Sequence, residues 1–281
     1  MSLKRKMWDT YRSLAARFPV IRKVLAPIRW YYHYNIFSYA IHRLLGISYR
    51  EWYAKTLNSF ANSIDIPDPG EGLEALEKQM GNHQLEYLKN QGLKPHHSLL
   101  DYGCGYLRAG IHFIDYLEPG NYTGIDISSG RLNQGKRILA KLRLEQKRPE
   151  LVALPDMKLE KLTGKKFDFI WSHGVLSHMP AEDIELLIKS LPNILGENSV
   201  FLGNYTELAE GKVKMATLRH FFFNHSVFEK LCAKYGLRCE FMVEWENIHP
   251  HELSKIDRMV KISPRSADST VEQEETVHTA R

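Results

Sequence analysis

The sequence predicts an α/β fold in which helices flank a mostly parallel, doubly wound sheet. From Leu73 onward, short apolar runs that suit buried strands alternate with stretches whose apolar residues recur at helical spacing. The glycine-rich turn Gly103-Cys104-Gly105 follows one such run, and a second run ends in the acid Asp126. With 281 residues, 43% of them hydrophobic, the chain can bury one core of ordinary domain size and still carry an extension.

The expected elements follow one another in the order of a doubly wound sheet. A helix near 73–90 ends at Gly92, a second covers about 107–117, and a basic third helix continues through 147. Strands are expected at 97–102, 122–126, 150–154, 167–172, 199–203, 238–243 and 258–262. Together these elements define an α/β domain over 73–263, followed by a polar, disordered tail over 264–281.

Residues 1–72 are predicted to be a basic, aromatic-rich helical extension with a linker. Between Met7 and Ile28 apolar residues recur at alternating steps of four and three, which places them on one stripe of an amphipathic helix. Eight basic residues against one acid give residues 1–30 a net charge of +7. Such a helix suits either an anionic membrane surface or packing on the α/β domain, and both readings stay open.

Composition also indicates the compartment. The three cysteines form no close pair, which favours a reducing environment, and no apolar run is long enough to span a bilayer. We therefore expect a cytoplasmic protein, with peripheral membrane contact through the extension. The spacing His249-Pro250-His251 offers too few ligands for a metal site, so no metal is expected, and no pattern sets an oligomeric state.

The two strand-ending motifs suit a cofactor that contains adenosine but no phosphates. Asp126 stands 25 residues after Asp101, where a carboxylate can accept both ribose hydroxyls. A dinucleotide fingerprint starting at Gly103 would require glycine at position 108, where the chain has Arg108. Pyrophosphate binding is thus disfavoured.

The segments 99–105 and 122–128 resemble motifs I and II of class I S-adenosylmethionine-dependent methyltransferases, and the resemblance covers roughly 85–264. It implies a Rossmann-like, seven-stranded sheet whose last strand is antiparallel. It also implies S-adenosyl-L-methionine as cofactor, lying over the carboxyl ends of the first strands. The implied cofactor contacts are Asp101, Gly103, Cys104, Gly105, Tyr106, Asp126, Ile127, Asp156, Met157 and Ser172.

Methyl transfer to a hydroxyl or ammonium group also requires the removal of one proton. Histidine suits this task because its pKa lies near neutrality, and ligands of open parallel sheets bind beyond the carboxyl ends of the strands. The candidates selected by that rule are His173, His178, His249 and His251. For His178, capping or packing of the following helix is an open alternative.

The acceptor class is narrowed by what the sequence lacks. The Asn/Asp-Pro-Pro-aromatic motif of many methyltransferases that modify amino groups is replaced by Ser172-His173-Gly174-Val175, and no nucleic-acid-binding module is appended. A small-molecule, glycan or lipid-linked acceptor, methylated on oxygen or nitrogen, is therefore favoured over nucleic acid. The alternative is a non-catalytic protein that binds S-adenosylmethionine and docks to a membrane or partner.

Overall fold

A computed structural model describes residues 43–61, 74–162, 164–211, 213–217, 220–242 and 257–265. The predicted stripe between 7 and 28, the histidines His249 and His251, and the tail beyond 265 lie outside these residues. The chain divides into two compact units, one up to Thr56 and one from Leu57 onward. The α/β fold belongs to the second unit.

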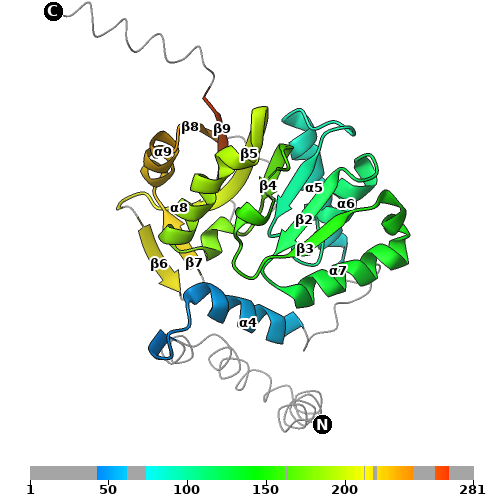
Figure 1. Ribbon diagram of the computed structural model, residues 1–281, viewed down its shortest axis with the longest axis horizontal. Helices are drawn as coiled ribbons and strands as arrows, with labels where there is room; N and C mark the ends of the chain where they lie inside the picture. The colour runs from blue at the N-terminus through cyan, green and yellow to red at the C-terminus, as the bar shows by residue number, and fades with distance from the viewer. Residues whose placement is uncertain are drawn as a thin grey trace, which may run out of the picture. The chain divides into compact units, whose positions relative to one another are not determined.

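A mixed sheet forms the centre of the second unit, with nine strands among the described residues (Figure 1). The strands are β1 Leu99–Tyr102, β2 Tyr122–Asp126, β3 Glu150–Ala153, β4 Phe167–Ser172, β5 Leu195–Glu207, β6 Val213–Thr217, β7 His220–Phe223, β8 Leu237–Met242 and β9 Asp257–Pro264. Strands β3-β2-β1-β4-β5 run parallel in that order, and β9 pairs antiparallel with β5. Strands at all seven expected places, with the last one antiparallel, are thereby confirmed.

The hairpin of β6 and β7 is an addition that the sequence patterns did not predict. Strand β7 pairs in parallel with the end of β5, where Thr206 is beside Phe222. Strand β9 occupies one edge of β5 over the same residues, and β4 occupies the other edge only as far as Gly203. Strand β7 therefore lies on the β4 side of β5, beyond the carboxyl end of β4.

Helices cover the sheet on both faces (Figure 1). These helices are α5 Glu74–Asn90, α6 Gly110–Tyr116, α7 Ser129–Leu142, α8 Ala181–Ser190 and α9 His225–Lys234, and a further helix, α4 Tyr49–Ala61, begins in the first unit and ends in the second. Helix α5 packs on α6, and α7 contacts β2 and β3, whereas α8 packs on α9. Right-handed crossovers place the first group and the second group on opposite faces. None of the helices in the described part of the chain is long and apolar enough to cross a membrane.

Helix α6 begins three residues later than the predicted helix near 107–117. Leu107 adopts φ 70°, in the left-handed region, so that the helix starts only at Gly110. The Leu107 side chain is fully buried, and it lies where a Cβ at Gly110 or Gly135 would be. Left-handed backbone costs a leucine about 1–2 kcal/mol, which burial of its side chain, at about 1.5–3 kcal/mol, offsets.

Strand register determines which side chains share a face of the sheet. Asp101 pairs with Trp171 and Trp171 with Leu202, and residues directly paired in neighbouring strands project to the same side. Trp171 and Leu202 belong to a core that also contains Phe113 of α6 and Met259 of β9. Asp101 therefore projects to the face that α5, α6 and α7 cover, at its carboxyl edge.

Candidate cofactor and acceptor site

The glycine-rich turn after β1 is tied to the neighbouring strand by its backbone. Gly103 and Gly105 have φ of 84° and 58°, which favour glycine. The N–H groups of Gly103 and Cys104 both donate to the carbonyl of Ile125, at 2.8 and 3.0 Å. Gly105 is buried, but a Cβ added there would meet no atom closer than Nη1 of Arg131 at 3.8 Å, so a small space lies beside its α-carbon.

The other glycine of the turn is covered. A Cβ at Gly103 would lie 2.3 Å from Cγ2 of Val175, in the loop after β4. That loop therefore packs directly on the turn. Cys104, between the two glycines, is buried, and burial raises the pKa of its thiol well above the usual value, as expected for a packing residue rather than a nucleophile.

Asp126, at the end of β2, organises the loop around it. Its Oδ2 accepts the N–H of Gly105 at 2.9 Å, and its Oδ1 accepts the N–H of Ser128 at 2.7 Å. A carboxylate has about four acceptor positions, so two remain for hydroxyl groups of a ligand. Burial raises the pKa of Asp126, while the nearby Arg131 and both N–H groups act against that rise.

Asp101 is buried beside a phenol. Its Oδ2 accepts the hydroxyl of Tyr122 at 2.7 Å. Burial raises the pKa of Asp101 to about 7, and the charge of Asp126 adds to this effect. A cationic ligand group against this carboxylate would favour its ionised form. Tyr122 was not among the predicted site residues, although its position four residues before Asp126 on one strand places both on one face.

The loop after β3 lies next to the Asp126 loop, because the N–H of Leu154 donates to the carbonyl of Asp126 at 2.9 Å. Met157 has φ 48° in this loop. Asp156 accepts the backbone N–H of Lys158 at 3.3 Å and Nζ of Lys161 at 3.4 Å. Partial burial works the other way, but these contacts hold the pKa of Asp156 below its usual value. The loop that contains the implied cofactor contacts Asp156 and Met157 is thus bonded to the backbone of Asp126.

Three other predicted residues take different positions. Ile127 and Tyr106 are half-buried, in the loops that follow Asp126 and Gly105. Ser172 is fully buried at the end of β4, and its Oγ has no hydrogen-bond partner among the described residues. It pairs with Gly203, next to the Trp171–Leu202 pair, so its side chain projects to the face opposite Asp101. The structure does not bring Ser172 together with the two acids.

The start of α7 is held by the end of α4, a contact that the sequence did not indicate. Oδ1 of Asn58 accepts the hydroxyl of Ser128 at 2.8 Å and the N–H of Gly130 at 3.0 Å. Nε2 of Gln134 donates to the carbonyl of Ala61 at 2.7 Å. These bonds orient the helix that begins directly after the Asp126 loop.

A second polar cluster lies past the end of β4. Oγ1 of Thr206 donates to Oδ1 of Asp257 at 3.0 Å and is 3.0 Å from Nε2 of His220. Nδ2 of Asn204 donates to Oδ2 of Asp257 at 3.3 Å, and Oδ1 of Asn204 accepts the N–H of Gly174 at 2.7 Å. Burial raises the pKa of Asp257, against these bonds and the charges of His220 and Arg258.

Of the predicted catalytic histidines, His178 joins this cluster. Its ring stands edge-on to that of His220, with centroids 5.7 Å apart and planes at 89°. The His173 ring instead stacks on Trp171, with centroids 6.0 Å apart. His220 was not among the bases selected from the sequence, and its partners Thr206 and Asp257, which are 51 residues apart, were not selected at all.

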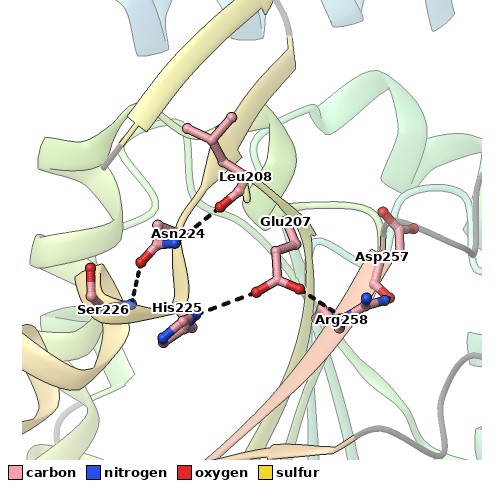
Figure 2. A network of polar contacts seen from close by, with 7 residues as sticks. All are labelled: Glu207, Leu208, Asn224, His225, Ser226, Asp257 and Arg258. Carbon is pink, nitrogen blue, oxygen red and sulfur yellow. Dashed lines mark hydrogen bonds and ion pairs between the residues drawn. The ribbon is translucent and has the colours of Figure 1, made fainter. Parts of the chain in front are cut away.

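An ion-pair cluster braces the same end of β5 (Figure 2). Glu207 is 2.8 Å from Nε of Arg258 and 3.5 Å from Nδ1 of His225, the first residue of α9. Asn224 caps α9 by accepting the N–H of Ser226 at 3.1 Å and donates to the carbonyl of Leu208 at 3.0 Å. Because Glu207 follows Thr206 directly, its side chain projects to the opposite face of the strand from the His220 cluster.

Sequence comparison supports the assignment of these motifs. Residues 100–201, from β1 into β5, match the family described as "Methyltransferase domain". An uncharacterised protein of Rickettsia prowazekii is 28% identical over 131 residues, 46% of this chain. The chain spans half the length of that relative.

Solved structures show the same fold. The magnesium protoporphyrin IX methyltransferase of Synechocystis PCC 6803, with bound S-adenosylmethionine, superposes with a TM-score of 0.58 at 15% identity, over 78% of this chain and 98% of that one. A glycopeptide N-methyltransferase in complex with S-adenosylmethionine has a TM-score of 0.50 at 15% identity, covering 66% and 94%. Residues 100–201 thus resemble the methyltransferase domain family, and the chain has the fold of the Rossmann-like, S-adenosylmethionine-dependent methyltransferases.

Proposed function

We propose that this chain transfers the methyl group of S-adenosylmethionine to an oxygen or nitrogen atom of a small-molecule, glycan or lipid-linked acceptor. The observation that carries the proposal is the carboxyl edge of β1 and β2. There, two buried acids on one sheet face border Gly105, which has free space beside its α-carbon. The cofactor would supply an electrophilic methyl group on a sulfonium.

The residues at this edge suit the parts of that cofactor. Asp126 offers its remaining acceptor positions to ribose hydroxyls, in a buried setting where such bonds are strong. Asp101 offers a carboxylate to the ammonium of the methionine part. The space beside Gly105 would take the chain of that part, and Ile127 and Met157, half-buried in the loops after β2 and β3, are the proposed adenine contacts. No phosphate-binding feature is required.

The proposed acceptor class is supported by the names of the solved relatives and by the sequence. Those relatives are named for a porphyrin and a glycopeptide, which are small molecules of very different shape. Catalysis by this chain then needs the acceptor to be positioned and one proton to be removed. The sequence analysis offers His173, His178, His249 and His251 as candidate bases, and the first two follow the carboxyl end of β4.

We also infer a location for this activity. The net charge of +7 and the apolar stripe of residues 1–30 support binding to an anionic membrane surface from the cytoplasm. Such a location would bring the domain to lipid-linked acceptors.

The first prediction tests the cofactor role of Asp126. Asp126→Asn should weaken binding of S-adenosylhomocysteine by about 1–3 kcal/mol, roughly 5- to 150-fold, because it replaces charge-assisted bonds to the ribose. Isothermal titration calorimetry measures this. The matched control is Asp115→Asn, an exposed acid on α6, which should bind as the parent does. Equal affinity of both variants would remove the basis of the proposal.

Turnover separates the enzyme from the non-catalytic alternative. Fractions of phenols, sugars, amines and extracted lipids are incubated with labelled S-adenosylmethionine, and transfer of label is measured. Transfer in at least one fraction, lost in Asp126→Asn at subsaturating cofactor, is expected. Binding of the cofactor without transfer to any fraction would favour the non-catalytic assembly protein instead.

A further inference from the structure

The His220 cluster lies on the same face of the sheet as the two cofactor acids. Side chains alternate along β5, so Thr206 projects to the same face as Leu202. Leu202 pairs with Trp171 and Trp171 pairs with Asp101, so all of these side chains share one face of the sheet. Asp257 pairs with Thr206, and Phe222 pairs with Thr206 from the other edge. His220, two residues before Phe222 on β7, projects to that same face.

Its position along the strands is just beyond the cofactor edge. Register pairs Phe222 of β7 with Thr206, so His220, two residues earlier on this parallel strand, falls near the level of Asn204, two residues past Leu202, on the β4 side of β5. From Asp101 this is one strand spacing, ~4.8 Å, across the sheet and two residues, ~6.6 Å, along it. A ligand over the ends of the first strands would therefore have its reacting end near this cluster.

Hydrogen-bond accounting fixes the tautomer of His220. The hydroxyl of Thr206 has one proton and donates it to Oδ1 of Asp257. Thr206 must then accept from His220, whose Nε2 is 3.0 Å away and carries the proton in the neutral ring. Nδ1 is left as the basic nitrogen. The Asn204 side chain has a fixed orientation, because its Oδ1 accepts the N–H of Gly174 and its Nδ2 therefore donates to Asp257.

We propose that His220 is the general base of the methyl transfer, with Thr206 and Asp257 as its positioning residues; this rests on the proposed function. As a lone pair of the acceptor oxygen or nitrogen forms the bond to the methyl carbon, the carbon–sulfur bond breaks and its electron pair returns to sulfur. The proton of the acceptor passes to Nδ1 of His220 and then to solvent. Asp257 stabilises the imidazolium through Thr206. The neighbouring His178 ring, edge-on to His220, limits its rotation.

The tautomer can be read without any acceptor. In full-length protein with ¹⁵N-labelled histidine, long-range ¹H–¹⁵N correlation spectra are recorded without ligand and with S-adenosylhomocysteine, at a pH where the ring is neutral. The His220 signals are assigned by their loss in His220→Gln. A protonated Nε2 and a bare Nδ1 are expected, and a predominant Nδ1–H form would overturn the proposal.

Asp257→Asn gives the sharper outcome. Nδ2 of Asn204 still donates to the amide oxygen of the new side chain, so its NH₂ group turns toward Thr206. The Thr206 hydroxyl then donates to Nε2, and His220 should change to the Nδ1–H tautomer. The control Thr123→Val, a buried threonine of β2, should leave the spectrum of His220 as in the parent. An unchanged tautomer in folded Asp257→Asn would contradict the assigned chain of donors.

Kinetics form the second arm, with the acceptor fraction that gives the highest transfer. His220→Gln should lower kcat by about 10²- to 10⁴-fold while the calorimetric affinity for S-adenosylhomocysteine stays within about twofold. The control is His225→Gln, on the opposite face, which should keep kcat within a few-fold. Turnover of His220→Gln equal to that of the parent would refute the base. If the parent protein did not bind S-adenosylhomocysteine, the proposed function would be refuted instead. The ¹H–¹⁵N spectra of the ligand-free protein would still determine the tautomer of His220.

Discussion

At the scale of single residues, the site contains carboxyl groups whose burial costs folding free energy. Asp101 and Asp126 are 5% and 3% exposed, and burial raises the pKa of both carboxyls. Groups with strongly perturbed pKa values that face a ligand edge are typical of functional sites. The hydrogen bond from the Tyr122 hydroxyl offsets only part of the cost of burying the Asp101 carboxylate. A cationic ligand group would offset more of it.

The raised pKa of Asp101 predicts how stability depends on pH. The carboxyl titrates near 3.8 in the unfolded chain and at about 7 in the folded one, so the native state holds its proton over that window. The free energy of unfolding therefore falls as pH rises toward 7, by about 1.4 kcal/mol per unit. Asp101→Asn removes this loss and should add about 2–3 kcal/mol more stability at pH 8 than at pH 5.

Urea denaturation of parent and variant at both pH values measures the effect. Tyr122→Phe provides a control of opposite sign, because it removes the donor that favours the ionised carboxylate and should lower stability at pH 8. The same stabilisation by Asp101→Asn at pH 5 and pH 8 would show that Asp101 titrates normally.

Residue type and spacing were sufficient to find the centre of the site. Asp101, Gly103, Gly105 and Asp126 follow from short motifs at strand ends, where chemistry restricts the choice of residue. Asn58 and Asp257 could not be found in this way. Their partners are 70 and 51 residues away, and only tertiary packing brings them together.

At the scale of elements, the loop after β4 packs on the glycine turn, so the effects on stability of substitutions at Gly103 and Val175 should not be additive. Gly103→Ala introduces both a strained φ and a clash with Val175, and should lower the free energy of unfolding by about 1–3 kcal/mol. Adding Val175→Ala should recover the part that comes from the clash. Urea denaturation of the single and double variants gives the coupling.

Gly120→Ala isolates the backbone contribution to that loss. Gly120 has φ 93° and nothing within 4 Å of an added Cβ, so only conformational strain is introduced there. A loss at Gly103 no larger than at Gly120, with no recovery by Val175→Ala, would mean that the loop yields freely.

Elements with one clear period were predictable, and the hairpin was not. Strands β1 and β2 are short segments that each end in an acid or a glycine turn, which made them recognisable in the sequence. Strand β7 instead contains three successive phenylalanines that show no alternation. Its faces become distinct only in the fold, where Phe221 and Phe223 are buried while His220 and Phe222 are half-buried. The hairpin carries the proposed base, so the sequence patterns missed this element together with the residue that we propose as the base.

At the scale of the whole molecule, the question is whether the N-terminal extension has a role separate from that of the α/β domain. The predicted boundary at 72/73 stays a prediction, but Asn58 and Ala61, on its extension side, bond to α7. The basic segment of residues 1–30 lies outside the described residues, and its composition alone supports a separate role. Membrane attachment would confine a diffusing domain to its acceptors without changing the chemistry at β1 and β2.

The last prediction tests that attachment. The full chain should co-sediment with vesicles that contain phosphatidylserine and not with pure phosphatidylcholine, and salt should weaken the binding. Changing Arg12, Arg17 and Arg22 to Gln keeps the apolar stripe and removes three charges, each worth about 1 kcal/mol near the surface, so affinity should fall up to roughly a hundredfold. Deleting residues 1–30 should abolish binding and leave the melting temperature of the domain unchanged. Retained co-sedimentation of the deleted chain would contradict the membrane role, and a large drop in its melting temperature would show that the stripe packs on the domain instead.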